Sequence, residues 1–332
     1  MVKYANFVYF LVLFLISCQT PSANHHNREL PAQEPFEYAI AIHGGAGFMT
    51  LDNLSAEQQR KYQSALDSAL SMGLEILMEG GKSLDAVETV IRFLEDHSLF
   101  NAGRGAVFTN QGKNELDASI MTGEDLKAGA VAGVTDIKNP ISAARAVMEK
   151  TEHVMLAGSG ASEFAKEAGL EIVDPSYFFT PERYRSLHRA LQEEEHGTVG
   201  CVALDKEGNL CAGTSTGGRT NKRYGRIGDS PIIGAGTYAN NQTCGVSGTG
   251  HGEFFMRFCA AYDISALMEY RGMTVGEAAT EVIMHKLKSA GGDGGVICLD
   301  QFGNPAMVFN TTGMFRAYGN SQGERYVAIF AD

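Results

Sequence analysis

One segment constrains the fold of this chain more than any other, a glycine–threonine pair at the start of a predicted β-hairpin. Gly197 and Thr198 directly precede a run of β-forming and small residues at 199–204, and a second such run follows at 210–216. The Lys-Glu-Gly-Asn segment between the two runs is typical of a hairpin connection. We therefore expect two adjacent antiparallel strands, with Thr198 at the beginning of the first and Thr216 at the end of the second.

Thr198 is a candidate nucleophile. A threonine hydroxyl is a weak nucleophile at neutral pH, but an N-terminal threonine can use its own α-amine as the base. That amine titrates near pH ~7.7–8.0, so a useful fraction is neutral at working pH. Self-cleavage between Gly197 and Thr198 would create such a terminus, and glycine tolerates the unusual backbone conformation that this reaction needs. A threonine at the start of a strand is more often only a β-former, so the surrounding motifs must decide.

Further polar motifs lie on both sides of the hairpin. Arg226 and Asp229 stand three residues apart in a Gly-rich segment, and Thr249-Gly250-His251-Gly252-Glu253 precedes a predicted helix. Four more motifs complete the set: His43-Gly44-Gly45-Ala46-Gly47, Phe100-Asn101-Ala102-Gly103, Glu115-Leu116-Asp117-Ala118-Ser119 and Asn310-Thr311-Thr312-Gly313-Met314.

With these motifs in this order, the chain from about Tyr38 to its C-terminus resembles the plant-type (type III) L-asparaginases, also called isoaspartyl peptidases, of the N-terminal-nucleophile (Ntn) hydrolases. The resemblance implies an α+β fold, the four-layer αββα sandwich with antiparallel sheets between helix layers. It also implies a threonine-nucleophile amidohydrolase that releases L-aspartate from L-asparagine or from β-aspartyl (isoaspartyl) dipeptides. Self-cleavage at Gly197–Thr198 would give an α chain, 18–197, and a β chain, 198–332. The resemblance also implies that two of the cleaved αβ units form a dimer.

The resemblance also implies a role for each motif residue. Thr216 would orient the Thr198 hydroxyl. The Thr249 hydroxyl and the Gly250 amide would stabilise the oxyanion, the kind of contact that typically contributes about 10²–10³ in rate. The substrate-binding residues would be Arg226 for the α-carboxylate, Asp229 for the α-ammonium, the backbone of Gly250 and Gly252, and Asn101 near the nucleophile.

The residues alone leave simpler interpretations open for some of these positions. Arg226 and Asp229 could form a structural salt bridge with each other. Thr214 and Ser215 are interpreted as polar residues of a strand edge, without a catalytic role.

No cofactor is expected for catalysis, but the resemblance implies a structural sodium ion. Backbone carbonyls in the loop 94–104 would hold this ion, and backbone ligation leaves almost no mark on a sequence. The ligands would be the carbonyls of Leu94, Glu95, His97, Phe100, Ala102 and Arg104.

The N-terminus is interpreted as a targeting segment. Lys3 precedes an apolar run, 7–16, that is too short to cross a bilayer and fits the core of a signal peptide. Leu15-Ile16-Ser17-Cys18 looks like a bacterial lipobox, so we expect a signal peptide at 1–17, lipidation of Cys18, a flexible tether at 18–36 and a single domain at 37–332. The protein would be an exported lipoprotein, periplasmic or attached to the outer membrane. An ordinary signal peptide cut near Ser22 or Ala23 is the alternative.

The charge and cysteine content of the chain limit the classes of binding partner that we expect. The formal net charge of −12 and the lack of a basic stripe argue against a nucleic-acid partner, so the expected partner is a small-molecule substrate. Five cysteines remain besides Cys18, and none forms a C-x-x-C metal pattern. Cys201 and Cys211 should lie on neighbouring strands, where we favour two small buried hydrophobic residues over a disulfide.

Two positions depart from the family pattern. Arg219 stands where relatives carry an apolar residue, often Met, and could favour substrates with an extra carboxylate. His251 lies in a position where the family varies.

Two alternative functions compete with this interpretation. Glycosylasparaginase shares the fold, but its relatives carry an aspartate before the nucleophile and Thr-Asn-Gly after the second threonine, where this chain has Gly197 and Gly217-Gly218. A non-catalytic surface-binding lipoprotein of the same fold is less consistent with the intact set of motif residues.

Hydrophobic periodicity predicts strands and helices in blocks, as in antiparallel sheets covered by helices. Helices are predicted at 55–79, 83–94 with Ser83 as the cap, 140–150, 162–168, 181–195, 254–270 and 274–288. Strands are predicted at 38–42, 106–108, 115–121, 130–134, 199–204, 210–216, 296–299, 306–309 and 326–330.

Overall fold

Alternate side chains of the central strands are buried on opposite faces of a sheet, and this pattern accounts for the layers of the protein. The computed structural model describes residues 35–50, 53–189 and 197–331. In β1 (Ala39–Gly47), Ile40 and Ile42 belong to one apolar core, whereas Ala39 and Ala41 belong to another. Because successive side chains of a strand point to opposite faces, both faces of this sheet are covered by other layers.

Two sheets form the centre of the unit that spans Glu34–Asp332. The larger sheet has the order β12-β11-β1-β5-β6-β2-β3-β4, and the smaller has the order β10-β9-β8-β7. All pairings are antiparallel except that of β3 with β4. Besides β1, the strands of the larger sheet are β2 (Leu116–Thr122), β3 (Ala128–Val134), β4 (Met155–Ala157), β5 (Val199–Leu204), β6 (Leu210–Thr216), β11 (Gly313–Asn320) and β12 (Arg325–Phe330). The smaller sheet contains β7 (Thr237–Ala239), β8 (Cys244–Gly250), β9 (Gly294–Asp300) and β10 (Pro305–Phe309).

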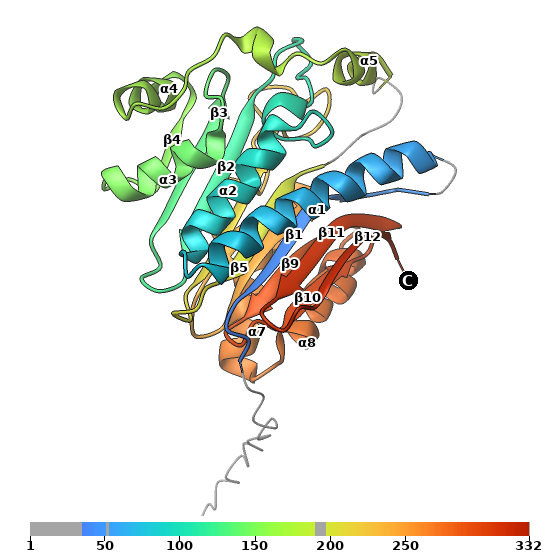
Figure 1. Ribbon diagram of the computed structural model, residues 1–332. Helices are drawn as coiled ribbons and strands as arrows, with labels where there is room; N and C mark the ends of the chain where they lie inside the picture. The colour runs from blue at the N-terminus through green and yellow to red at the C-terminus, as the bar shows by residue number, and fades with distance from the viewer. Residues whose placement is uncertain (1–34, 51–52, 190–196, 332) are drawn as a thin grey trace, which may run out of the picture. The chain divides into compact units, whose positions relative to one another are not determined.

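Helices cover the outer face of each sheet (Figure 1). The larger sheet is covered by α1 (Ala56–Met78), α2 (Ser83–Asp96) and α3 (Pro140–Lys150). The smaller sheet is covered by α7 (Ala260–Arg271), α8 (Val275–Thr280) and the π-helical segment η3 (Glu281–Leu287). Separate apolar cores lie in the three interfaces between these layers. The predicted αββα sandwich is therefore confirmed.

The shorter helices lie in the connections. They are α4 (Gly158–Glu167), α5 (Pro181–Arg189), α6 (Gly252–Phe258) and the 3₁₀ turns η1 (Gly103–Gly105) and η2 (Pro175–Phe178).

Several predicted boundaries were wrong for identifiable reasons. Ser83 is the first residue of α2 and not its cap; its N–H bonds to the carboxylate of Asp205. Residues 106–108 form no strand, because their backbone groups bond elsewhere: the Val107 N–H donates to Asn101 Oδ1, and the Phe108 carbonyl accepts the Asn221 N–H. The helix predicted at 254–270 is interrupted at Cys259, whose φ of 47° is left-handed. Such a conformation is uncommon in a residue other than glycine, so the sequence carries no signal for it.

The cysteine prediction is confirmed. Cys201 and Cys211 are buried and free, and they lie on the neighbouring strands β5 and β6. Among the described residues there is no group of three or more His, Cys, Asp or Glu side chains placed to hold a metal ion.

In the part of the chain that the structure describes, no helix is long and apolar enough to cross a membrane. The predicted signal peptide, Cys18 and nearly all of the predicted tether lie outside the described residues, as does the segment 190–196 just before the predicted cleavage site.

Candidate active site

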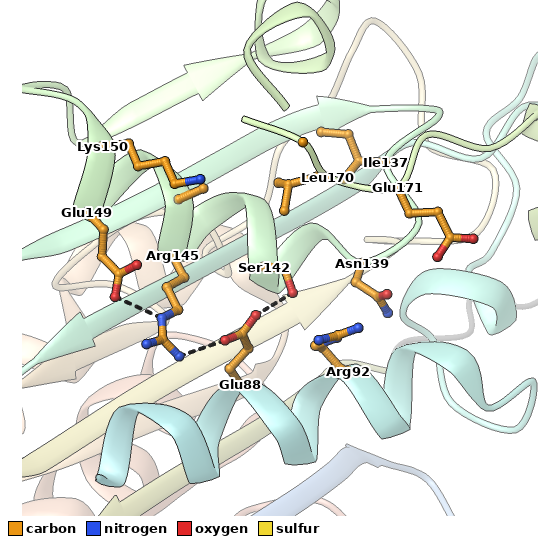
Figure 2. Close-up of a pocket in the computed structure, with 12 residues that line it drawn as sticks. Glu88, Arg92, Ile137, Asn139, Ser142, Arg145, Glu149, Lys150, Leu170 and Glu171 are labelled. Atoms are coloured by element: carbon orange, nitrogen blue, oxygen red, sulfur yellow. Dashed lines mark hydrogen bonds and ion pairs between the residues drawn. The ribbon is translucent and has the colours of Figure 1, made fainter. Parts of the chain in front are cut away.

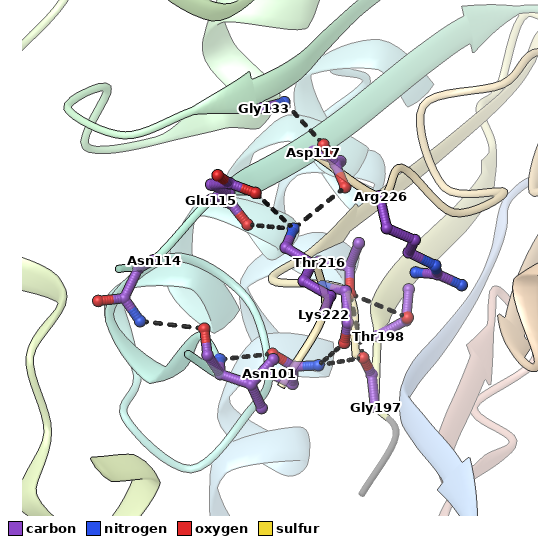
Figure 3. A network of polar contacts seen from close by, with 12 residues as sticks. Asn101, Asn114, Glu115, Asp117, Gly133, Gly197, Thr198, Thr216, Lys222 and Arg226 are labelled. Atoms are coloured by element: carbon purple, nitrogen blue, oxygen red, sulfur yellow. Dashed lines mark hydrogen bonds and ion pairs between the residues drawn. The ribbon is translucent and has the colours of Figure 1, made fainter. Parts of the chain in front are cut away.

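A relay of two hydroxyl groups connects the candidate nucleophile to the peptide bond before it. Thr198 immediately precedes β5, and Thr216 ends β6, so the hairpin pairing brings the two side by side. The Thr198 hydroxyl donates to Thr216 Oγ1 at 3.2 Å, and the Thr216 hydroxyl donates to the Gly197 carbonyl at 3.1 Å (Figure 3). The N–H of Gly218 donates to Thr216 Oγ1 at 2.9 Å. Thr216 is thus held in place to orient the Thr198 hydroxyl.

Asn101 is the second donor to the Gly197 carbonyl. Its Nδ2 donates to the carbonyl oxygens of Gly197 and Gly218, both at 2.7 Å, and its Oδ1 accepts the Val107 N–H at 2.9 Å. In the uncut chain Asn101 therefore faces the bond that is predicted to be cut, rather than the charged end of the pocket.

A bulge in β1 packs against the same peptide bond. The register of β1 with β11 shifts between His43 and Gly45, and Gly45 has a φ of 114°. A Cβ at Gly45 would lie 3.2 Å from Gly197 Cα and 3.3 Å from Thr198 N. Only glycine combines this left-handed backbone with so close an approach, so the glycine motif shapes the wall beside the predicted cleavage site.

His43 holds the other side of Thr198, and sequence reasoning gave it no role. Its Nδ1 lies 3.0 Å from the Thr198 carbonyl oxygen, and its Nε2 lies 2.9 Å from Ser247 Oγ. Burial lowers the pKa of His43 to about 3, although the bond to the Thr198 carbonyl acts in the opposite direction. The ring is therefore neutral; Nδ1 carries the proton for the carbonyl, and Nε2 accepts from Ser247.

The predicted oxyanion pair lies on β8, across the interface between the two sheets. Thr249 is fully buried, and its Oγ1 accepts the N–H of Ala46 at 3.2 Å. Gly250 lines the pocket and has a φ of 142°. A Cβ there would lie 2.4 Å from the Asp293 carbonyl oxygen, so this position also requires glycine.

Arg226 is bound by a residue that sequence reasoning missed. Its Nε and Nη2 donate to the two carboxylate oxygens of Glu253, each at 2.9 Å. Burial alone would raise the pKa of Glu253, but the bonds from Arg226 lower it to about 2. The charged partner of Arg226 is thus Glu253, and not Asp229 as the salt-bridge interpretation supposed. Glu253 ends a glycine-rich motif, and its charge was the only signal available in the sequence.

Asp229 is buried beside Arg226 with part of its carboxylate unsatisfied. Its Oδ2 has no hydrogen-bond partner among the described residues, and burial raises the pKa of Asp229 to about 6. A Cβ at Gly252 would lie 2.5 Å from Asp229 Oδ1 and 3.1 Å from Arg226 Nη2. Glycine at this position therefore keeps both charged groups accessible to a ligand.

A buried lysine lies behind the turn that follows Thr216. Lys222 Nζ donates to the Glu115 carbonyl at 2.9 Å and lies 3.8 Å from the Glu115 carboxylate and 4.0 Å from that of Asp117 (Figure 3). Burial lowers the pKa of Lys222 and raises that of Asp117. The Glu-Leu-Asp-Ala-Ser motif thus supports the pocket from behind, a role that its sequence does not reveal.

Thr214 and Ser215 are not strand-edge residues. Their strand, β6, lies inside the larger sheet, and both side chains are fully buried. Ser215 donates to Glu95 at 2.7 Å, and Thr214 lies 2.7 Å from Ser247 Oγ. The expectation of a polar edge was wrong because strand order cannot be read from one strand.

Most of the residues named by sequence reasoning line one small pocket, whereas Asn101, Thr249 and Gly252 do not line it. Its volume is about 10 Å³, and it is lined by Gly197, Thr198, Thr216, Gly218, Arg219, Arg226, Gly228, Asp229, Ser230 and Gly250. A larger hollow of about 370 Å³ lies between α2 and α3 (Figure 2). There Arg145 is already paired with Asp85, Glu88 and Glu149. The small pocket is therefore the candidate active site.

Comparison with known proteins agrees with this geometry. The family model described as asparaginase matches residues 36–329. The chain is 50% identical over 295 residues to an isoaspartyl peptidase of Escherichia coli, with 84% of this chain and 92% of that protein covered. It is 42% identical over 299 residues to a plant-type L-asparaginase of Pyrococcus horikoshii, with coverage of 84% and 95%. It is 40% identical over 283 residues to an isoaspartyl peptidase/L-asparaginase of Xenopus laevis, with coverage of 83% and 90%. These matches extend over the αββα sandwich and its threonine pocket, and this chain belongs to the asparaginase family.

Proposed function

We propose that this enzyme hydrolyses the side-chain amide of L-asparagine or the isopeptide bond of β-aspartyl dipeptides, with Thr198 as the nucleophile. The observation that carries the proposal is the arrangement of one pocket: an oriented threonine hydroxyl at one end and an Arg–Asp pair at the other. An asparagine or β-aspartyl substrate carries its reacting amide at one end and its charged α-groups at the other, which matches these two ends of the pocket.

Self-cleavage is the first reaction. The Thr198 hydroxyl attacks the carbonyl carbon of Gly197 and gives its proton to Thr216, which at the same time gives its own hydroxyl proton to the Gly197 oxygen. Asn101 donates to that oxygen as negative charge develops on it. Collapse of the intermediate breaks the C–N bond and gives an ester, and the released nitrogen takes up the proton. Water then hydrolyses the ester, leaving a Gly197 carboxylate and a free α-amine on Thr198.

Substrate turnover uses the new amine. The amine accepts the Thr198 hydroxyl proton while the hydroxyl oxygen attacks the side-chain carbonyl of the substrate. The Thr249 hydroxyl and the Gly250 N–H stabilise the oxyanion; because Thr249 Oγ1 already accepts from Ala46, its proton is left for the substrate. Ammonia or an amino acid leaves with the proton, and water hydrolyses the β-aspartyl ester to release L-aspartate.

Recognition of the amino-acid end follows from the charges. Glu253 occupies the Nε–Nη2 edge of Arg226. The Nη1 side faces two glycines: a Cβ at Gly218 would lie 3.5 Å from Nη1, and one at Gly228 would lie 2.8 Å from it. A substrate α-carboxylate would bind at this second edge of the guanidinium. The α-ammonium would bind the unsatisfied oxygen of Asp229, which supplies the partner that this buried carboxylate lacks.

Mass spectrometry and a substrate panel test the proposal. The purified protein should contain a new N-terminus at Thr198 and should hydrolyse L-asparagine, a β-aspartyl dipeptide, or both. Preferential hydrolysis of GlcNAc-asparagine would favour glycosylasparaginase instead. A single uncut chain without amidohydrolase activity would favour the non-catalytic binding protein.

We further propose a structural sodium ion in the loop 94–104. Glycines let the backbone close tightly there: a Cβ at Gly105 would lie 2.0 Å from the Phe100 carbonyl oxygen, and one at Gly103 would lie 2.4 Å from that of Glu95. Arg183 donates to the carbonyl of Leu99 in this loop and to that of Gly105 just after it. Backbone carbonyls here thus already bind one cationic group, and hard cations prefer oxygen ligands of this kind. Thermal unfolding should occur at a higher temperature in sodium chloride than in choline chloride of equal ionic strength, and equal temperatures would contradict the proposal.

Export, lipid attachment at Cys18 and assembly into a dimer of αβ units complete the proposal. The Leu-Ile-Ser-Cys motif supports the first two. Cys18→Ala should move the protein from the membrane fraction to the soluble fraction; a wild type without lipid would contradict this. Light scattering on the cleaved protein tests the dimer.

A further inference from the structure

Two of the residues that line the active-site pocket carry a fixed positive charge, and only one of them has a role in the proposed reaction. Arg226 is held by Glu253 and assigned to the α-carboxylate of the substrate. Arg219 lines the same pocket as Thr198 and Thr216. A second guanidinium beside the nucleophile changes which substrates the site can recognise.

The backbone beneath Arg219 is held in place. Gly218 has a φ of 78°, and its N–H is bonded to Thr216 Oγ1 at 2.9 Å. The carbonyl of Arg219 accepts the Lys222 N–H at 3.2 Å. Arg219 therefore follows Thr216 by three residues in a turn that is fixed on both sides, and its half-buried side chain extends from a defined point at the pocket.

The contact of Arg219 with His251 can be released without leaving His251 Nε2 unsatisfied. Arg219 Nη1 lies 3.2 Å from His251 Nε2, and His251 Nε2 also lies 3.4 Å from Glu253 Oε2. A guanidinium only donates hydrogen bonds, and one ring nitrogen cannot accept from Arg219 and donate to Glu253 at once. If Arg219 turned toward a substrate anion, His251 Nε2 could carry a proton and donate to Glu253.

The substrate geometry leaves one candidate anion. With the reacting carbonyl at Thr198 and the α-end at Arg226 and Asp229, the remaining part of the substrate is the leaving group. In a β-aspartyl dipeptide this is an amino acid whose carboxylate lies within about 5 Å of the reacting carbon, from standard bond lengths. Free asparagine releases ammonia, which has no such group.

We propose that Arg219 forms a subsite for the carboxylate of the leaving amino acid, so that the enzyme selects β-aspartyl dipeptides with a free C-terminal carboxylate over L-asparagine. This inference rests on the proposed function, because it assigns the leaving-group side of the same pocket. Loss of a hydrogen-bonded charged contact of this kind corresponds to about a 10- to 100-fold change in kcat/KM.

The test compares β-aspartyl-leucine with β-aspartyl-leucinamide, which lacks only the carboxylate charge, and uses L-asparagine as a third substrate. Wild-type enzyme should prefer the acid over the amide by about 10- to 100-fold in kcat/KM. Arg219→Met should lower this preference to near one, with a much smaller effect on asparagine, and Arg219→Lys should restore part of it. Arg223→Met removes an exposed arginine of the same segment that does not line the pocket, and it should keep the wild-type preference.

The outcomes separate this inference from the proposed function. If the wild type hydrolyses acid and amide equally well, the subsite is overturned while the amidohydrolase stands. If Arg219→Met keeps the wild-type preference, the carboxylate is recognised elsewhere and the subsite is again overturned. If no substrate of the panel is hydrolysed, the proposed function itself fails. Should Arg219→Met not self-cleave on a gel, the wild-type comparison and Arg219→Lys still decide.

Discussion

The two ends of the active-site pocket differ in how many of their polar groups are hydrogen-bonded within the uncut chain. At the nucleophile end, formed by Gly197, Thr198, Thr216 and Asn101, each side chain and the Gly197 carbonyl are hydrogen-bonded within the chain. At the substrate end, formed by Arg226, Asp229 and Glu253, the Arg–Glu pair is complete, but Asp229 Oδ2 has no partner among the described residues.

This difference bears on the two proposed reactions. The nucleophile end already holds the Gly197–Thr198 bond, so the proposed self-cleavage would need nothing from outside. At the substrate end an unsatisfied buried carboxylate is costly until it finds a donor, and the ammonium group of the proposed substrate would supply that donor. Variants at the two ends should therefore affect maturation and turnover differently.

The largest effect is expected at the nucleophile itself. Thr198→Ala should remain one uncut chain and lose turnover by about 10⁴-fold or more, since the attacking oxygen is absent. A denaturing gel and kcat on L-asparagine measure the two reactions. Thr122→Ala, which removes a hydroxyl at the far end of β2, is the control and should behave as wild type. A cut Thr198→Ala chain would show that another residue performs the cleavage.

Arg226→Ala should show most clearly that maturation and turnover depend on different ends of the pocket. It should still mature, but kcat/KM on asparagine and on β-aspartyl dipeptides should fall by about two to three decades, as expected for loss of one partner of a desolvated ion pair. Arg226→Lys should recover only part of the activity, because an ammonium lacks the two-pronged geometry. If matured Arg226→Ala kept full activity, the α-carboxylate would be bound elsewhere.

Asn101→Ala should give the opposite pattern. Removing its bond to the Gly197 carbonyl should slow self-cleavage by about 10²-fold, by analogy with the loss of one oxyanion donor. The time course of fragment formation in freshly refolded protein measures this rate, and thermal unfolding checks that the variant is folded. Cleavage at the wild-type rate would remove Asn101 from the maturation mechanism.

The pH dependence of turnover should report the unsatisfied carboxylate. Asp229 must be ionised to bind the substrate ammonium, and burial raises its pKa to about 6. The Thr198 α-amine, which must be neutral and titrates near pH ~7.7–8.0, already makes kcat/KM fall on the acidic side. Below pH about 6 protonation of Asp229 should add a second tenfold fall per pH unit. Asp229→Asn should be less active and should lack this additional fall, while keeping the one that the amine causes. A profile that steepens below pH about 6 in Asp229→Asn as in the wild type would assign the second titration to another group.

Local patterns in the sequence were sufficient to predict much of the fold and to place the candidate nucleophile at the start of a strand. The strands at 199–204 and 210–216 and the helix at 140–150 have the predicted boundaries, because alternation, turn residues and Pro140 are local signals. The same hairpin brings Thr198 next to Thr216, since pairing within a hairpin follows from its turn. The motifs also led to Arg226, Asp229 and Gly250, which line one pocket, and to Thr249, which is buried beside Gly250 and accepts the Ala46 N–H.

The contacts between layers were decided only by the tertiary structure. His43 and the Thr198 carbonyl are 155 residues apart in sequence, and Lys222 and the Glu115 carbonyl are 107 apart. Ser247 reaches His43 only because the smaller sheet packs on the larger one. A strand pattern shows which side chains share a face, but not which strand of another sheet lies opposite. The sequence by itself therefore determined the hairpin that carries the candidate nucleophile, while sheet packing decided what holds this hairpin in position.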